Sequence, residues 1–347
     1  MISASRLAGL TLCGFLAVGL VGCSSAVPDE PEQVASGTSD DWTPVTIEHA
    51  LSTTTIDDRP ERVATVAWAN HEIPLALGVV PVGMAASTWG DDDGDGVHPW
   101  VEERLEELDA QTPVLFDETD GIDFEAVANT RPDVILAGYS GLSQEDYDTL
   151  SKIAPVVAYP EAPWATPWRE TVEINSKALG MADEGAQLIA DIEAGIADAV
   201  AEHPELEGAT AMMVTHVDVN DLSEISFYSA HDTRSKFFED LGMEVPASLE
   251  ELSAGSDSFS GSLSAERADV FEDVDIFVTY GGQDLIDALE ADPLLSQLPA
   301  VENGAIVTLP GDSPLGTVAN PTALQVSSMV DDYVELLAEA ARASAGE

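Results

Sequence analysis

The sequence predicts an α/β fold with two lobes joined by a long helix. Short runs rich in valine and isoleucine alternate with helical patterns before and after a central segment, and that segment, Trp168 to Glu202, has no strand pattern. Apolar residues make up 45% of the 347 residues, so the chain can build two cores of ordinary size.

The chain opens with a pattern typical of a signal peptide, which we expect over residues 1–22. Arg6 precedes the apolar run Leu7–Val21, and small and acidic residues follow it. Leu20-Val21-Gly22-Cys23 resembles the bacterial lipobox, in which the cysteine thiol takes a diacylglyceryl group. We therefore expect lipidation of Cys23, followed by a flexible tether over residues 23–44, because residues 26–41 lack an apolar period.

The charge of the chain limits its partners. There are 65 Asp plus Glu and 12 Lys plus Arg, a formal net charge of −53. Such a surface repels nucleic acid and anionic lipid headgroups, so we expect no nucleic-acid partner and membrane contact through the lipid alone. Cys13 lies in the segment expected to be removed, which leaves no disulfide within one mature chain.

The first lobe is expected over residues 45–167. Three apolar runs predict buried strands, and helical segments such as Val101 to Leu108 separate them. The predicted strands are Val63 to Trp68, Asp133 to Gly138 and Pro155 to Tyr159.

The connecting helical region is expected over residues 168–204. An apolar stripe at helical spacing predicts one long helix, which ends at His203-Pro204 because proline cannot continue it. The stripe consists of Leu188, Ile189, Ile192, Ile196 and Val200. The second lobe then follows over 205–347, with strands predicted at Ala209 to Thr215, Ile225 to Tyr228, Val274 to Tyr280 and Ala305 to Leu309.

The two halves contain an internal echo. In DFEAVANTRPDVILAGY, Glu125 stands fourteen residues before Tyr139, and in SAERADVFEDVDIFVTY, Glu266 stands fourteen before Tyr280. Each segment predicts a short helix that leads into a strand ending at a tyrosine. Ligands of open α/β sheets bind beyond the carboxyl ends of strands, so both tyrosines should face the space between the lobes.

At this point the sequence resembles the iron-siderophore and cobalamin type of ABC substrate-binding protein. The resemblance is carried, in family order, by RVATVAWANHEIPLALGVVPVGM, FEAVANTRPDVILAGYSGL with IAPVVAY, the block from Trp168 to Gly180, and VENGAIVTLP. It implies two Rossmann-like lobes joined by one rigid helix, which is the helical-backbone periplasmic-binding-protein fold, and a ligand cleft between the lobes.

The resemblance also implies a function and a docking pair. The expected function is capture of a ferric siderophore outside the cell and its delivery to a permease dimer, with haem, cobalamin or a structural role in a surface lipoprotein as alternatives. In the family, one glutamate on each lobe meets arginines of the permease, and Glu125 and Glu266 match those positions. We expect a monomer, because docking needs a single copy.

Aromatic residues at the ends of strands are the candidate ligand-binding residues. Flat rings line pockets for bulky chelates, whereas each ring alone could equally be core. The candidates are Trp68, Trp89, Tyr139, Trp164, Tyr228 and Tyr280, joined by Arg169 and Arg234, which stand close to them in sequence. Either arginine could pair with a catecholate or carboxylate of the chelate, or only with an acid of the chain, so catecholate and hydroxamate chelates both remain open.

No resident metal or cofactor is expected, because the chelator would hold the iron. His71, His98, His216 and His231 form no cluster with metal-site spacing. A weaker hypothesis is a calcium loop, since Asp91, Asp93, Asp95 and Glu102 fit its pattern. Pro99 and Glu102 fit the start of a helix equally well.

Catalysis is not expected. Gly138-Tyr139-Ser140-Gly141 lacks the spacing of a nucleophile elbow, and neither a phosphate loop nor a dinucleotide fingerprint is present. A hydrolase would need a triad built on Ser140. The sequence thus predicts a binding protein held by lipid at the extracellular face of the cell membrane.

Overall fold

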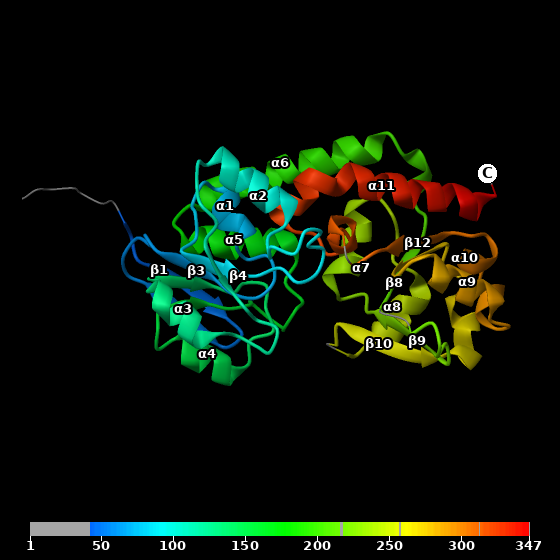
Figure 1. Ribbon diagram of the computed structural model, residues 1–347. Coiled ribbons are helices and arrows are strands. Elements are labelled where there is room, and N and C mark those ends of the chain that lie inside the picture. Colours follow the sequence, from blue (N-terminus) through cyan, green and yellow to red (C-terminus); the bar gives the residue numbers. More distant parts are fainter. Residues whose placement is uncertain (1–41, 216–217, 257, 312, 347) are drawn as a thin grey trace, which may run out of the picture. The chain divides into compact units, whose positions relative to one another are not determined.

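The computed structural model describes residues 42–215, 218–256, 258–311 and 313–346. The expected signal peptide, the lipidated Cys23, most of the tether and His216 lie outside the described residues. Residues from Trp42 onward form one compact unit, which contains two α/β lobes (Figure 1). Among the described helices, none is both long and apolar enough to cross a bilayer.

The first lobe contains a five-stranded parallel sheet. Its strand order is β5 (Val114–Phe116), β4 (Gly83–Ala85), β3 (Val63–Thr65), β6 (Val134–Leu136) and β7 (Val156–Val157). An antiparallel hairpin, β1 (Val45–His49) and β2 (Ser52–Ile56), precedes it. The helices are α1 (Glu72–Ala76), α2 (Pro99–Glu107), α3 (Phe124–Thr130) and α4 (Gln144–Leu150). The central strands are buried on both faces, which explains their continuous apolar runs.

The second lobe contains a mixed sheet of the same winding. Its order is β10 (Ser260–Ser264), β9 (Glu224–Tyr228), β8 (Ala211–Val214), β11 (Ile276–Tyr280) and β12 (Ile306–Leu309), with β9 antiparallel to both neighbours. The α-helices are α7 (Thr233–Asp240), α8 (Ala247–Ser253), α9 (Gln283–Ala291), α10 (Pro299–Glu302) and α11 (Ala323–Ala345). Short 3-10 helices are η1 (Pro204–Leu206), η2 (Ala265–Phe271), η3 (Leu295–Gln297) and η4 (Pro314–Thr317).

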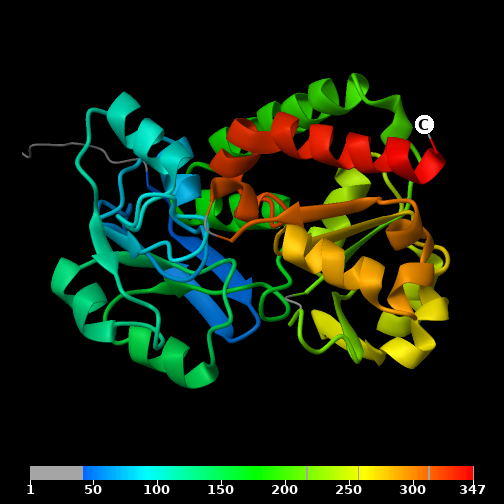
Figure 2. The ribbon, with the colours of Figure 1, turned by 45° about the vertical axis from the view of Figure 1, so that its right-hand side comes forward.

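Two consecutive helices join the lobes where the sequence predicted one. They are α5 (Trp168–Ala178) and α6 (Ala182–Ala201), and the chain turns between them at Gly180, whose φ is +69°. A side chain at Gly180 would also collide with the Trp42 ring, 2.3 Å from the ideal Cβ position. The predicted stripe belongs to α6, which lies beside α11 in both views (Figures 1 and 2).

The cores of the two lobes are continuous at the α6–α11 side. One apolar cluster contains Ile73 of the first lobe and Val172 of α5 together with Val318 and Ala323 of the second lobe. Apolar packing of this kind resists sliding of one lobe on the other. The arrangement confirms the predicted two-lobed α/β fold and leaves the carboxyl ends of β3, β6 and β11 near one cavity.

Candidate functional site

A cavity of about 310 Å³ lies between the loops that follow the strands of the two lobes. Its walls are mostly aromatic. The lining residues are Trp68, Trp89, Tyr139, Trp164, Tyr228, Asp232, Arg234, Phe259, Tyr280, Gly316, Thr317 and Asn320. Seven of the eight predicted ligand-binding residues are therefore brought together here.

Arg169 is the exception, and its prediction as a cavity residue is corrected. It lies at the start of α5 and is not among the residues that line this cavity. Its Nη1 donates to both carboxylate oxygens of Asp240 at 2.9 Å, and its Nε donates to Glu193. Trp168 beside it is buried and donates to Asp240 as well. Both side chains therefore tie α5 to α7, as the alternative of a structural ion pair supposed.

The loop that carries Trp68 is held in an unusual conformation. Ala67 and Ala69 both have positive φ, 60° and 56°, which costs an alanine about 1 kcal/mol each. The buried Asn70 compensates, because its Nδ2 donates to the carbonyls of Val66 and Tyr139, both at 2.8 Å, and its Oδ1 accepts the Tyr139 N–H. Asn70 thus fixes Trp68 and Tyr139 relative to each other.

Trp164 reaches the cavity because a glycine stands opposite. The backbone φ of Trp164 is +58°, and the backbone N–H of Trp164 donates to the carbonyl of Ser140 at 3.0 Å. A Cβ on Gly141 would lie 2.1 Å from the Trp164 Nε1, so only glycine leaves room for the indole. The Tyr139 ring meets Trp164 edge to face at 5.4 Å.

Trp89 crosses from the first lobe to the second. Its Nε1 donates to the carbonyl of Gly316 at 2.9 Å, and its ring meets Tyr280 edge to face at 5.3 Å. A Cβ on Gly311 would lie 2.1 Å from the indole, which therefore rests directly on that glycine backbone. His98 supports the Trp89 backbone from behind, with its Nε2 at 2.9 Å from the Trp89 carbonyl.

Arg234 is the single cation among the described residues of this cavity wall. Its guanidinium lies 4.2 Å from the centre of the Tyr228 ring, donates to Tyr280 Oη at 3.1 Å and pairs with the fully buried Asp232 at 3.1 Å. Burial alone would lower the pKa of Arg234, but the charge of Asp232 raises it above its ordinary value. The cation is fixed and already balanced by one carboxylate.

Two phenols of the cavity remain protonated. Burial raises the pKa of Tyr228 to about 12, although Arg234 opposes the rise. Burial likewise raises the pKa of Tyr139, whose hydroxyl lies 3.4 Å from both Thr233 Oγ1 and Asn320 Oδ1 of the second lobe. Both rings can offer a face or a hydroxyl to a ligand, and neither offers a phenolate at neutral pH.

A further tie between the lobes lies behind the cavity, at Glu72 of α1. This side chain is only 1% exposed, and it accepts the Trp100 Nε1–H at 2.8 Å and the backbone N–H groups of Leu324 and Gln325 at the start of α11. Burial raises the pKa of Glu72, and the hydrogen bonds that it accepts oppose the rise. A carboxylate at the start of a 23-residue helix is also favoured by the helix dipole.

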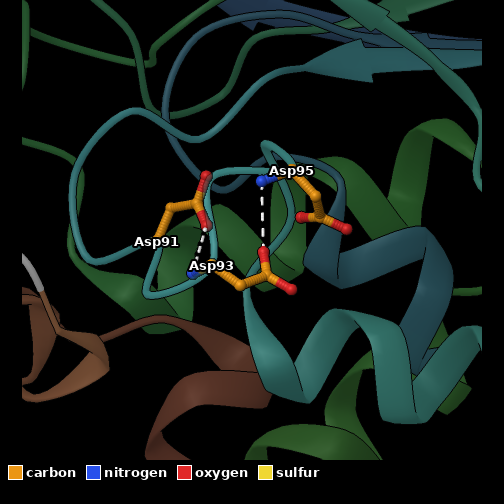
Figure 3. A group of neighbouring side chains, drawn as sticks. All are labelled: Asp91, Asp93 and Asp95. Atoms are coloured by element: carbon orange, nitrogen blue, oxygen red, sulfur yellow. Dashed lines mark hydrogen bonds between the residues drawn. The ribbon is translucent and has the colours of Figure 1, made fainter.

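Three of the four acids predicted for a calcium loop lie close together. Carboxylate oxygens of Asp91, Asp93 and Asp95 lie within 4.8 Å of one another, without Glu102 (Figure 3). Asp91 accepts N–H groups of Gly94 and Gly96, both at 2.8 Å, and Asp95 accepts that of Val97 at 2.8 Å. Slight desolvation and the charges of Asp95 and Asp93 raise the pKa of Glu102, an exposed residue in the first turn of α2. The backbone of this loop is thus organised by its own carboxylates.

The remaining predicted residues lie away from the cavity. Glu125 and Glu266 are exposed in the first turns of α3 and η2. His231 is exposed and lines a separate cavity with Lys236. Ser140 is fully buried, and its hydroxyl donates to the Ala137 carbonyl, so it is not presented as a nucleophile.

Sequence reasoning missed part of the site. Phe259, Asp232, Thr317 and Asn320 line the cavity without having been predicted. Asp232 caps α7 by accepting the Arg234 N–H, and an Asp two residues before the predicted Arg234 was the available signal. Thr317 ends η4 and Asn320 follows it, eight and eleven residues after β12 ends at Leu309, so a rule that looks directly beyond strand ends does not find them.

Comparison with known proteins agrees with this geometry. The family model described as periplasmic binding protein matches residues 63–313. PiaA of Streptococcus pneumoniae, solved in complex with ferrichrome, is 43% identical, with a TM-score of 0.83 and coverage of 86% of this chain and 99% of that one. A probable siderophore-binding lipoprotein of Bacillus subtilis, YfiY, is 26% identical over 75% of each chain.

Another relative matches a larger part of the chain than YfiY does. The ferric-anguibactin-binding protein FatB of Vibrio anguillarum is 26% identical over 84% of this chain and 87% of its own. The match to the family model spans most of the two lobes and includes nine of the twelve residues that line the aromatic cavity. The chain therefore belongs to the periplasmic binding protein family.

Proposed function

We propose that this chain is the solute-binding component of an ABC importer and that it captures a ferric hydroxamate siderophore in the aromatic cavity. The observation that carries the proposal is the composition of the wall: seven aromatic side chains surround one guanidinium that is already paired with a buried carboxylate. Aromatic faces hold a bulky chelate through contact area, and Arg234 can still donate to its oxygens.

The balance of charge selects among the chelates. A ferric tris-catecholate is strongly anionic and would need several unpaired cations, whereas a ferric tris-hydroxamate is neutral. The described wall contains Arg234 alone, opposite Asp232, in a chain of net charge −53. A strongly anionic ligand would be repelled by this field. The ferrichrome bound to the PiaA relative is itself a hydroxamate, which supports the same class.

Haem and catalysis are less well supported. A tyrosine that ligates haem iron does so as phenolate, and burial raises the pKa of Tyr228 to about 12. No histidine stands among the described residues of the aromatic cavity. Ser140, the one candidate nucleophile, keeps its hydroxyl bonded to the Ala137 carbonyl. We therefore propose a binding protein without a reaction of its own.

Tryptophan fluorescence of the purified protein tests the ligand class. Trp68, Trp89 and Trp164 line the cavity, so a bound ferric chelate should quench them. We expect saturable quenching at micromolar or lower concentration by a neutral ferric hydroxamate, and none by a ferric catecholate, haem or cobalamin. Quenching by the catecholate alone would contradict the hydroxamate assignment, and silence from every ligand would favour a structural surface lipoprotein.

Delivery to the permease forms the second part of the proposal. We infer that the mature chain is a monomer, is anchored through Cys23 at the outer face of the membrane, and docks a permease dimer through Glu125 and Glu266. Both carboxylates are exposed, one on each lobe, and such pairs set orientation and association rate against basic pockets. In Figure 1, α3 and β10, which directly precedes η2, lie on the side away from α6 and α11.

Uptake measurements test the docking pair separately from ligand capture. In cells, the double substitution Glu125→Ala and Glu266→Ala should lower uptake of iron from the chelate by tenfold or more, on the order expected for two interfacial charges. The chelate Kd of the double variant, measured by fluorescence, shows whether a loss of uptake comes from docking to the permease or from chelate binding. Normal uptake by the double variant would contradict these positions.

A further inference from the structure

A second cavity, of about 370 Å³, adjoins the aromatic cavity and lies within the first lobe. The two cavities share Trp68 and Trp164, so the two indoles stand between them. Small side chains such as Ala67, Ala85 and Ala86 form much of the second wall. A chelate held in the first cavity could extend a flexible arm past the indoles into the second.

The second cavity is acidic where the first contains a cation. Its described lining includes Glu118, Asp146, His71 and His98, with no Lys or Arg among them. Asp146 accepts the Ser143 N–H and hydroxyl at the start of α4. Both ring nitrogens of His98 have hydrogen-bond partners: Nδ1 contacts the Ser87 hydroxyl and Nε2 contacts the Trp89 carbonyl. Burial, with His98 nearby, lowers the pKa of His71 to about 3, so His71 is neutral.

Glu118 is left without a cation in this wall. Its Oε2 accepts the Ala67 N–H at 2.9 Å, and its Oε1 is buried without a hydrogen-bond partner in the described structure. Trp68 Nε1 and His71 Nδ1, on two other residues of the same wall, are also buried and without a partner among the described residues. A buried polar atom left unpaired costs roughly 1–3 kcal/mol, so the acceptor Glu118 Oε1 indicates a place for a ligand group that donates a hydrogen bond. The Trp68 Nε1–H is itself a donor and would not pair with such a group.

We propose that the second cavity is a subsite for a cationic arm of the siderophore, an alkylammonium group, and that Glu118 is the residue that selects it. The inference rests on the proposed function, because the arm must belong to a chelate held in the aromatic cavity. An ammonium brings three donors to the carboxylate, and the faces of Trp68 and Trp164 attract cations. Hydroxamates with such an arm would bind more tightly than those without one.

Protonation of Glu118 should control the selection. Burial raises the pKa of Glu118 to about 7, and the Ala67 N–H opposes the rise. The other titratable groups of the wall are His71, His98 and Asp146, and none is a permanent cation. The Glu118 carboxyl is therefore mostly ionised at pH 8 and mostly neutral at pH 5.5. Preference for an ammonium arm should be present at pH 8 and lost as the pH falls.

A matched pair of chelates tests the subsite. Ferrioxamine B is a linear ferric tris-hydroxamate with a free terminal ammonium, and its N-acetylated form has a neutral, slightly larger amide in place of that ammonium. The probe is the ratio of their Kd values, measured by tryptophan quenching at pH 8 in 1 M NaCl, where long-range attraction by the acidic surface is screened. We expect the ammonium form to bind about tenfold more tightly or better, as for a charge-assisted hydrogen bond.

The variant Glu118→Gln isolates the charge, because a glutamine oxygen can still accept the Ala67 N–H. The Kd ratio should fall to about one in this variant and in the wild-type protein at pH 5.5, and stay at about tenfold in Glu103→Gln, an exposed glutamate of α2. A wild-type ratio near one at pH 8, or a tenfold ratio that survives Glu118→Gln, would overturn the subsite while both chelates still bind.

Other outcomes separate the subsite from the function on which it rests. If neither chelate quenches, the hydroxamate function fails and the subsite with it. If Glu118→Gln does not fold, as judged by its thermal transition, the wild-type ratio at the two pH values decides. A ratio that does not change between pH 8 and pH 5.5 then overturns the role of Glu118.

Discussion

The two lobes have the same strand order but give the cavity different chemistry. In each sheet the first strand is central and the winding reverses beside it, at β3 in one lobe and β8 in the other. The first lobe contributes three indoles, the Tyr139 phenol and, behind them, Glu118, whereas the second contributes two phenols, Phe259 and the Arg234–Asp232 pair. The backbone plan is thus repeated, and the loops beyond the strands determine what each wall can bind.

The largest effect is expected from removing the cation of the second lobe. Arg234→Gln leaves Asp232 buried without its partner and takes the donor from the cavity. Breaking such a pair costs about 3 kcal/mol of stability, and loss of the donor should weaken chelate binding about a hundredfold. Thermal unfolding and tryptophan quenching measure the two losses.

A double variant separates the two roles of Arg234. Asp232→Asn with Arg234→Gln removes both charges, so stability should largely return while binding stays weak. Wild-type affinity in the single variant would show that the second lobe contributes rings alone, and the contrast between the lobes would disappear.

The next effect concerns the link between the lobes. Glu72→Ala leaves the Trp100 Nε1–H and the Leu324 and Gln325 N–H groups buried without an acceptor. We expect a loss of about 3 kcal/mol in the free energy of unfolding, measured with urea. Glu106→Ala, an exposed change on α2, is the control and should stay within about 0.5 kcal/mol. Equal stability of the two variants would contradict a structural role for Glu72.

A smaller effect is expected where Trp89 crosses the cavity. In Gly311→Ala the new Cβ would lie 2.1 Å from the indole, so the ring must leave Gly316 and Tyr280. Loss of one hydrogen bond and one ring contact should weaken chelate binding about tenfold. Gly195→Ala, in open space on α6, controls for the added methyl group. Undiminished affinity in Gly311→Ala would place the chelate away from Trp89.

The last effect is a pH dependence from the first lobe. Burial raises the folded-state pKa of Glu118 to about 7, above its value in the unfolded chain. Its stabilising contribution is therefore full at acidic pH and is lost as the pH rises through 7. Glu118→Gln lacks this loss, so its stability relative to wild type should increase by up to about 3 kcal/mol between pH 4.5 and pH 8. Urea unfolding at the two pH values measures the change. If the free energies of unfolding of wild type and variant changed by the same amount with pH, the pKa of Glu118 would not be raised in the folded state.

The sequence predicts which aromatic side chains meet in the cavity for a physical reason. Trp68 and Tyr139 follow parallel strands, and Tyr280 ends one, so the sheet geometry gathers all three at one edge. Arg169 stands beside an aromatic in sequence as well, but it opens a helix, and a helix start faces whichever element packs there, in this case α7. Position in the sequence therefore predicts a cavity residue where the residue follows a strand, but not where it stands at the start of a helix.

Other features depend on tertiary contacts that no local pattern encodes. The break between α5 and α6 is set by Gly180 against Trp42, more than a hundred residues earlier in the chain. The echo also differs in detail: Asp123 caps an α-helix at α3, whereas Arg267, with φ −113°, interrupts the 3-10 helix η2. The sequence does not predict Glu118, because its burial depends on the loop of Ala67 and Trp68, which packs over it.

The contact of Trp89 with Gly311 and Gly316, together with the Tyr139 and Glu72 links, has a thermodynamic consequence. The two walls are held in register by bonds internal to the protein, so a chelate need not supply the energy to assemble them. Such preorganisation limits the entropy lost on binding. Differences among chelates should then appear mainly in dissociation rates, and tight ligands will be those that stay longest.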